Sequence, residues 1–225
     1  MSAVVAVDGP AASGKSTAAR GVARRLGFGH LNSGLLYRAV GWAARREGWD
    51  LTEEEEVRRR LEDLELALEP VDGRYRVRVD GERPGDELRA EEVAGAASSV
   101  SRLGPVRERV NALIRREAGR RPLVCDGRDV GTAIFPDADL KVWLTASPRE
   151  RARRRLSEEG GEATPDRIRR TADRIRARDD ADAGRSLDPL RRADDAVEID
   201  TTDLDPEEVV ERILEAARRR GLDPG

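Results

Sequence analysis

Short apolar runs alternate along the chain with longer segments in which apolar residues recur every three or four positions. The short runs predict five strands, at residues 3–7, 30–33, 122–126, 140–144 and 196–200. The longer segments predict helices at residues 17–26, 34–48, 52–63, 87–101, 105–120 and 206–220. Because strands separated by helices are typical of a doubly wound sheet, we predict an α/β fold around a five-stranded parallel sheet.

Two of these helices begin with recognisable signals. Thr52 stands three residues before Glu55, the spacing of a capping box, so we expect the Thr52 side chain to cap that helix. Pro105 suits the first turn of its helix, where a missing N–H is no loss.

The hydrophobic period changes to two between residues 64 and 83. Leucines alternate with other residues from Leu64 to Leu68, and arginines alternate with apolar residues from Arg74 to Val79. Turn-forming pairs separate the runs, at Asp72-Gly73 and Asp80-Gly81. This pattern predicts a small antiparallel β insert within the βα chain.

Residues 148–185 form the most charged stretch and contain few large apolar side chains. Such a segment cannot build much core, so we expect mobile helices that lie over the sheet edge as a lid. Arg178 and Arg185 are seven positions apart, which would place them on one face of one helix.

The composition excludes several classes of protein. Charged residues make up 39% of the 225 residues with a net charge of -3, so nonspecific binding to nucleic acid is disfavoured. The single Cys125 excludes an internal disulfide, and the single His30, expected to be structural, excludes His-rich metal sites. Without a leader-like start or an apolar run of membrane-spanning length, the chain is expected to be a cytoplasmic monomer that binds no membrane.

Lys15, one of only two lysines, lies in a segment that matches the phosphate-binding pattern G-x-x-x-x-G-K-[ST]. An apolar strand precedes the segment and a helix follows it, as a P-loop requires. Backbone N–H groups and the Lys15 ammonium would hold the phosphates of ATP, and Ser16 would offer its hydroxyl to Mg²⁺. The residues expected to bind ATP here are Gly9, Pro10, Ala11, Ala12, Ser13, Gly14, Lys15, Ser16 and Thr17.

A P-loop alone fits a GTPase, an ATPase motor or a kinase, so the remaining motifs must decide. Ser33 and Arg38 stand at a predicted helix start and one turn later, where they suit a second anion. The sequence Asp126-Gly127-Arg128-Asp129 follows a buried strand, at the sheet edge where α/β proteins bind ligands. Asp126 either ends that strand or holds a Mg²⁺-bound water, and we favour the second interpretation.

Taken together, these motifs resemble bacterial cytidylate kinases, a family of P-loop nucleoside monophosphate kinases. The resemblance runs nearly end to end, and the inserted β segment is similar to the one on the monophosphate-binding side of those enzymes. The motifs that carry it are Val7-Asp8-Gly9-Pro10, Ser33-Gly34 with Tyr37-Arg38, Ala96-Ala97-Ser98, Val106-Arg107, Asp126-Gly127-Arg128-Asp129-Val130-Gly131-Thr132, Phe135-Pro136-Asp137-Ala138, and Arg178 with Arg185.

The resemblance implies a role for each matching residue. Contacts to the acceptor phosphate fall to Ser33, Arg38, Gly127 and Arg128, and contacts to the cytosine fall to Ser98, Arg107 and Asp129. The ribose would meet Asp182 and Arg178, while Arg185 would reach the transferred phosphoryl group and Arg154 the ATP. Tyr37 either stacks on the nucleotide or packs. The residues expected to act in catalysis are Lys15, Arg128, Arg178 and Arg185.

Two positions depart from the family pattern. Asn32 stands where an acid is common, and Ser16-Thr17 follows Lys15 where many nucleotide kinases have glycine first. The second departure leaves two hydroxyls for Mg²⁺, and the loop geometry favours Ser16.

The predicted function is ATP-dependent phosphorylation of CMP and dCMP by direct in-line transfer, with Mg²⁺ as cofactor. One kinase domain, residues 1–225, would comprise a core at 1–33 and 121–225 and a monophosphate-binding region at 34–120. The alternatives are a kinase for UMP, AMP or another small acceptor, and an Arg-rich P-loop protein that binds nucleic acid. The net negative charge of the chain disfavours binding to nucleic acid.

Overall fold

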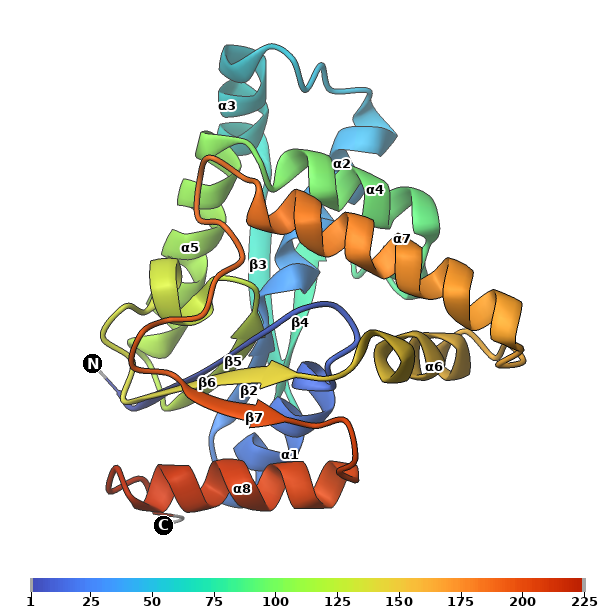
Figure 1. Ribbon diagram of the computed structural model, residues 1–225. Helices are drawn as coiled ribbons and strands as arrows, with labels where there is room; N and C mark the ends of the chain where they lie inside the picture. Colours follow the sequence, from blue (N-terminus) through green and yellow to red (C-terminus); the bar gives the residue numbers. More distant parts are fainter. Residues whose placement is uncertain (1, 224–225) are drawn as a thin grey trace.

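The computed structural model describes residues 2–223, and its strands form one sheet (Figure 1). Within these residues seven strands lie in the spatial order β3-β4-β2-β5-β1-β6-β7. Their bounds are Val4–Asp8 (β1), Gly29–Asn32 (β2), Leu66–Val71 (β3), Arg74–Val79 (β4), Leu123–Gly127 (β5), Leu140–Thr145 (β6) and Val197–Asp200 (β7). The five predicted strands pair in parallel, which confirms the predicted fold class.

Helices cover both faces of the sheet, because successive side chains of the buried strands point to opposite faces. In β1, Val4 and Ala6 join a core under α2, α3, α4 and α5, while Val5 and Val7 join a core under α1 and α8. The helices are Lys15–Leu26 (α1), Ser33–Glu47 (α2), Glu54–Asp63 (α3), Glu91–Val100 (α4), Gly104–Ala118 (α5), Pro148–Glu158 (α6), Pro165–Ala183 (α7) and Pro206–Arg218 (α8), with shorter turns at Asp86–Arg89 (η1) and Val130–Ile134 (η2).

The predicted β insert is the hairpin β3–β4, and it extends the central sheet. The two strands pair antiparallel from Leu66↔Val79 to Val71↔Arg74. A single parallel pair, His30↔Arg74, joins the hairpin to β2. The sheet therefore has two more strands than the five expected, because the apolar face of the hairpin packs into the same core as α2 and α3.

Two local predictions about helices are wrong. Thr52 does not cap α3, because its N–H and hydroxyl both donate to Asp50 Oδ1, at 2.9 and 2.7 Å. The helix expected at residues 87–101 is divided at Ala90 into η1 and α4. Arg38 Nη1 donates to the carbonyl oxygen of Leu88 at 2.7 Å, which occupies an acceptor that a continuous helix would use. Pro105 lies in the first turn of α5, as predicted.

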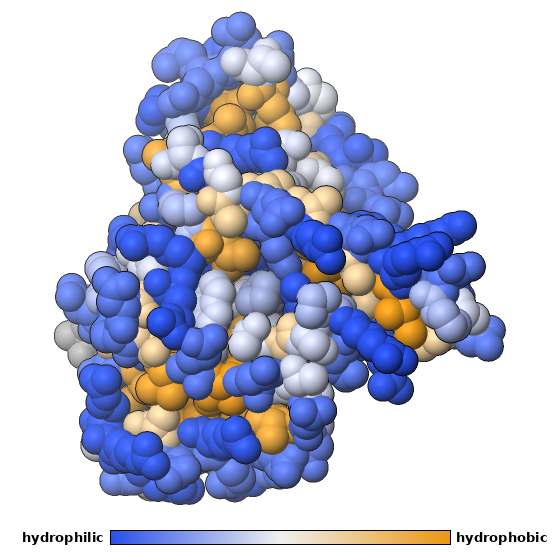
Figure 2. All heavy atoms as spheres, viewed as in Figure 1, coloured by the Kyte–Doolittle hydropathy of each residue, from blue (hydrophilic) through white to orange (hydrophobic). Residues whose placement is uncertain are grey.

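The helices α6 and α7 pack against each other and project from the body of the molecule (Figure 1). Hydrophilic residues predominate on the face shown in Figure 2, including most of this projection. Among residues 2–223, no helix has both the length and the apolar character that crossing a bilayer requires.

Candidate active site

A cavity of 280 Å³ lies beyond the carboxyl ends of β2 and β5, next to the loop that follows β1. This edge is where open α/β sheets bind their ligands. Most of the predicted site residues meet here: Ala12 to Thr17, Ser33, Tyr37, Arg38, Ser98, Asp126 to Asp129, Arg178, Asp182 and Arg185 line the cavity, together with Asn32, Ser101 and Arg155. The predicted residues Gly9, Pro10, Ala11, Arg107 and Arg154 lie outside this lining.

The loop between β1 and α1 has a backbone that only glycine permits at two points. A Cβ on Gly9 would stand 2.0 Å from the carbonyl oxygen of Leu144. Gly14 has φ 88° and forms the N-cap of α1. Space requires the first glycine, and a left-handed backbone favours the second. The loop therefore leads directly from a buried strand into a helix N-terminus, the arrangement that the motif predicts.

Lys15 begins α1, and its side chain folds back over the loop. Nζ donates to the carbonyl oxygen of Pro10 at 2.5 Å and to Ser13 Oγ at 3.4 Å. Desolvation, followed by the nearby charge of Arg128, lowers the pKa of Lys15 well below its ordinary value. A phosphate bound in the loop would counter this shift, because it supplies the negative charge that a buried ammonium lacks.

Ser16 belongs to a hydrogen-bond network at the end of β5. Its hydroxyl donates to Asp126 Oδ2 at 2.6 Å, and Asn32 Nδ2 donates to both of these oxygens at 2.8 Å. His30 Nε2 lies 2.7 Å from Asp126 Oδ1. The structure thus unites the predicted Ser16 and Asp126, and His30 and Asn32 hold the carboxylate in place.

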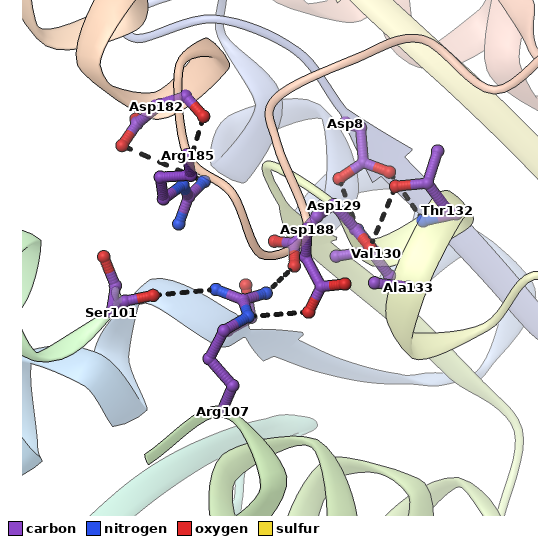
Figure 3. A network of polar contacts seen from close by, with 12 residues as sticks. Asp8, Ser101, Arg107, Asp129, Val130, Thr132, Ala133, Asp182, Arg185 and Asp188 are labelled. Atoms are coloured by element: carbon purple, nitrogen blue, oxygen red, sulfur yellow. Dashed lines mark hydrogen bonds and ion pairs between the residues drawn. The ribbon is translucent and has the colours of Figure 1, made fainter. Parts of the chain in front are cut away.

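Asp8, at the end of β1, supports the site from outside the cavity lining, and the sequence assigned it no role. Its carboxylate accepts hydrogen bonds from the N–H groups of Val130 and Gly131, at 2.9 and 2.7 Å (Figure 3). Desolvation raises the pKa of Asp8 to about 6, although the two backbone hydrogen bonds oppose the shift. Asp8 therefore positions the turn that follows Asp129. The available signals were an acid that ends an apolar strand and its place in the motif Val7-Asp8-Gly9-Pro10.

Ser33 and Arg38 stand on the first turns of α2. Ser33 Oγ donates to the carbonyl oxygen of Asp126 at 3.0 Å, which ties α2 to the end of β5. A Cβ on Gly127 would lie 2.4 Å from Ser33 Oγ, so this approach depends on glycine. Arg38 lines the cavity while it donates to the Leu88 carbonyl oxygen.

Four arginines line the cavity from the end of β5 and from the lid: Arg128, Arg155, Arg178 and Arg185. Arg128 Nε donates to Asp182 Oδ2 at 3.0 Å. Desolvation, followed by the charge of Arg128, lowers the pKa of Arg178 to about 10. Arg185 Nη2 is buried 3.9 Å from Asp182 Oδ1 and donates no hydrogen bond to the described side chains and backbone. Crowded cations with an unused donor form a site for an anion.

The prediction that Arg178 and Arg185 share one helix is wrong. The helix α7 ends at Ala183, and Gly184 is its C-cap, so Arg185 lies in the loop beyond. Arg185 reaches the same cavity because its Nε donates back to the carbonyl oxygen of Asp182 at 3.1 Å.

Arg107 and Asp129 form a buried ion pair at the other end of the cavity. Arg107 Nη2 donates to Asp129 Oδ2, Nη1 donates to the carbonyl oxygen of Ser101 at 3.1 Å, and Nε donates to Asp188 Oδ2 at 2.6 Å (Figure 3). Desolvation raises the pKa of Asp129, against the opposing charge of Arg107. Asp129 and Ser98 line the cavity, while Arg107 stands behind Asp129. The contact from Asp188 was not predicted.

Tyr37 belongs to the core cluster as well as to the cavity lining. Its ring centre lies 5.6 Å from Arg107 Cζ, a cation–π distance. Burial raises the pKa of Tyr37, and its hydroxyl has no hydrogen-bond partner among the described residues. The Tyr37 side chain therefore packs in the core, and its stacking on a nucleotide stays a prediction.

The lid contacts the P-loop directly. The Ala11 N–H donates to Asp179 Oδ1 at 2.9 Å. Arg151 forms an ion pair with Asp179 and donates to the Ala11 carbonyl oxygen at 3.2 Å. These contacts join both lid helices to the loop, and the sequence did not indicate them.

Arg154 lies next to the P-loop, since a Cβ on Gly14 would stand 3.6 Å from its Nη1, and its contact with ATP stays a prediction. It donates to Thr201 Oγ1 at 2.8 Å and to the Thr201 carbonyl oxygen at 2.6 Å. Its neighbour Arg155 lines the cavity instead.

Comparisons with known proteins agree with this site. A family model described as cytidylate kinase matches residues 5–219. The chain is 45% identical to a cytidylate kinase of Desulfitobacterium hafniense, over 93% of this chain and 90% of that protein. It is 42% identical to a cytidylate kinase of Pseudomonas aeruginosa, over 98% of this chain and 97% of that protein.

The fold has solved counterparts at lower identity. The structure of TT1252 from Thermus thermophilus superposes with a TM-score of 0.52 at 20% identity, and the match covers 97% of both chains. This likeness supports the fold alone. The family model and the relatives decide the family, and the chain belongs to the cytidylate kinases.

Proposed function

We propose that this chain transfers the γ-phosphoryl group of ATP to CMP, and also to dCMP. The observation that carries the proposal is one cavity that unites the P-loop lysine, five arginines and the Asp129 carboxylate. Relatives named cytidylate kinase over nearly the whole chain support it. We include dCMP because the proposed contacts to phosphate and base are common to both nucleotides.

The phosphate end of the cavity binds the reacting groups. The P-loop N–H groups and Lys15 hold the ATP phosphates, and Arg185 offers its Nη2, which donates no hydrogen bond to the described residues, to the charge that develops during transfer. Ser33, Arg38 and Arg128 place the acceptor phosphate in line. Because an oxygen of that phosphate is already anionic, the reaction needs no general base from the protein.

The residues around Ser16 fit a Mg²⁺ ion. Ser16 Oγ and the Asp126 carboxylate offer the oxygen ligands that Mg²⁺ prefers, and this ion binds proteins through few direct ligands besides phosphate and water. When bound, the ion neutralises phosphate charge. Asn32 and His30 orient the Asp126 carboxylate for this purpose.

The base end of the cavity selects cytosine. Asp129 faces the cavity with one oxygen held by Arg107, so the other oxygen can accept a hydrogen bond from the exocyclic amine of cytosine. Ser98 offers a hydroxyl beside it. Uracil presents a carbonyl oxygen at the position of that amine, and two acceptors repel each other.

The lid contributes arginines and excludes water. Arg178 and Asp182 face the expected ribose position, and both α6 and α7 contribute residues to the cavity lining. A closed lid prevents transfer of the phosphoryl group to water. We also propose the division into a core, a lid and a monophosphate-binding region at residues 34–120, in a cytoplasmic monomer.

An ADP-release assay across CMP, dCMP, UMP and AMP tests the proposal. We expect the highest kcat/KM for CMP or dCMP and lower values for UMP and AMP. Lys15→Ala serves as the control for contaminating kinases, because it removes the phosphate-binding ammonium. A kcat/KM for UMP or AMP above that for CMP would assign the chain to another acceptor.

A further inference from the structure

A strap formed by residues 184–190 connects the lid to α5. It begins at Gly184, the C-cap of α7, and Leu190 N–H donates back to the carbonyl oxygen of Asp182 at 3.0 Å. At its midpoint the Leu187 side chain lies beside Gly104, the first residue of α5. The strap therefore links Arg185, at the phosphate end of the cavity, to the helix that carries Arg107.

Asp188 occupies an unusual backbone conformation within this strap. Its φ is 45°, in the left-handed region, which Asp tolerates better than most residues but still at a cost. In this conformation the carboxylate points at the Arg107 guanidinium, 2.6 Å from Nε (Figure 3). A backbone held in a sparsely populated region, with its side chain bonded to the guanidinium that pairs with the cavity-lining Asp129, is grounds for a functional hypothesis.

Two carboxylates share the Arg107 cation. All three guanidinium nitrogens are engaged, by Asp188, by Asp129 and by the carbonyl oxygen of Ser101. Of the two carboxylates, Asp129 is buried, whereas the Asp188 side chain is 35% exposed and reaches Arg107 from the edge of the site. Arg107 binds Asp129 through Oδ2, and Oδ1 of Asp129 accepts no hydrogen bond from residues 2–223.

We propose that Asp188 is a positioning residue that sharpens the choice of base. By sharing Arg107, it leaves more negative charge on Asp129 and fixes the orientation of that carboxylate. The open Asp129 oxygen then binds a donor such as the cytosine amine more strongly, and rejects the uracil carbonyl more strongly. This inference rests on the proposed function. A residue that merely satisfied a buried guanidinium would affect both nucleotides equally.

Two variants and a control separate these roles. Asp188→Asn keeps the shape and removes the charge, and Asp188→Gly removes the side chain while it suits the left-handed backbone. Asp194→Asn is the matched control, because Asp194 is an exposed acid a few residues beyond the strap. In both Asp188 variants the ratio of kcat/KM for CMP to that for UMP should fall about three- to tenfold, the effect of weakening one hydrogen bond. Most of the loss should appear in KM for CMP.

Calorimetric binding of CMP and of UMP to the same variants, without ATP, gives a readout that needs no turnover. The ratio of the two dissociation constants should shift in the same direction as the kinetic ratio. An unchanged ratio in folded variants, or equal losses for CMP and UMP, would overturn the role of Asp188. A wild-type protein without preference for CMP would instead reject the proposed function and, with it, this inference.

Discussion

The two ends of the cavity are built in different ways. At the phosphate end, the P-loop supplies contiguous residues. The cations there include a donor that makes no hydrogen bond to the described residues, the buried Nη2 of Arg185. At the base end, Arg107 has all three guanidinium nitrogens engaged by protein oxygens. The phosphate end therefore offers hydrogen-bond donors that a bound anion would use. The base end presents the Asp129 carboxylate, an acceptor that Arg107 already holds in position. The phosphate end suits any nucleotide, whereas the base end can discriminate between bases.

Removal of Lys15 tests the phosphate end most directly. We expect Lys15→Ala to lower kcat between a hundredfold and a thousandfold, about 2.7–4 kcal/mol, for CMP and UMP alike. Lys15→Arg should fail as well, because the planar guanidinium is too bulky for the position that Nζ occupies beside Pro10. Lys141→Arg is the control, since Lys141 pairs with Asp195 outside the cavity. An alanine variant with more than about a tenth of the wild-type kcat would contradict the role of Lys15.

Asp8 and Asp129 are both buried acids, but amides stabilise one and a guanidinium the other. The folded protein holds the Asp8 proton more tightly than the unfolded chain does, because its pKa is raised from 3.8 to about 6. The contribution of Asp8 to stability is therefore greatest below pH 4, and it is lost as the pH rises through 6.

Denaturant unfolding of the ligand-free wild type and of Asp8→Asn, from pH 4 to pH 8, measures this contribution. The free energy of unfolding of the wild type relative to the variant should fall by about 2–3 kcal/mol up to pH 6–7 and then level off. A difference that does not depend on pH would show that Asp8 titrates normally.

Asp129 provides the corresponding test of the base end. We expect Asp129→Ala to lower kcat/KM for CMP about tenfold to a hundredfold, as charged hydrogen bonds are worth about 1.5–3 kcal/mol, and to harm UMP much less. Thermal unfolding of the variant serves as the control, because the change leaves Arg107 with Asp188 as its remaining carboxylate. Equal losses for the two substrates would place Asp129 in the structural support of Arg128 and would contradict base reading.

The same contrast explains how much could be predicted from the sequence. The P-loop, the parallel strands and Ser16 follow from local patterns, because their contacts lie within a few residues or at strand ends. The contact of Arg107 with Asp188 joins residues 81 positions apart, and that of Ala11 with Asp179 joins residues 168 apart. The hydrophobic periodicity of the sequence does not indicate such contacts, because they form only when distant segments meet in the folded chain. Likewise, Thr52 has the residue type and spacing of a helix cap, but its hydroxyl donates to the nearer Asp50 carboxylate instead.

The hairpin β3–β4 should report whether the base side of the molecule moves on binding. It meets the rest of the sheet through a single backbone pair, His30↔Arg74, whereas β1 and β5 share five. We therefore expect hydrogen exchange of residues 66–79 in the ligand-free protein to be faster than that of β1 and β5. CMP should slow exchange in the hairpin or its flanking helices, and ATP alone should act mainly on the P-loop. CMP protection confined to residues 9–17 and 126–129 would mean that the hairpin is a fixed extension of the sheet, and that base selection depends only on the prearranged carboxylate.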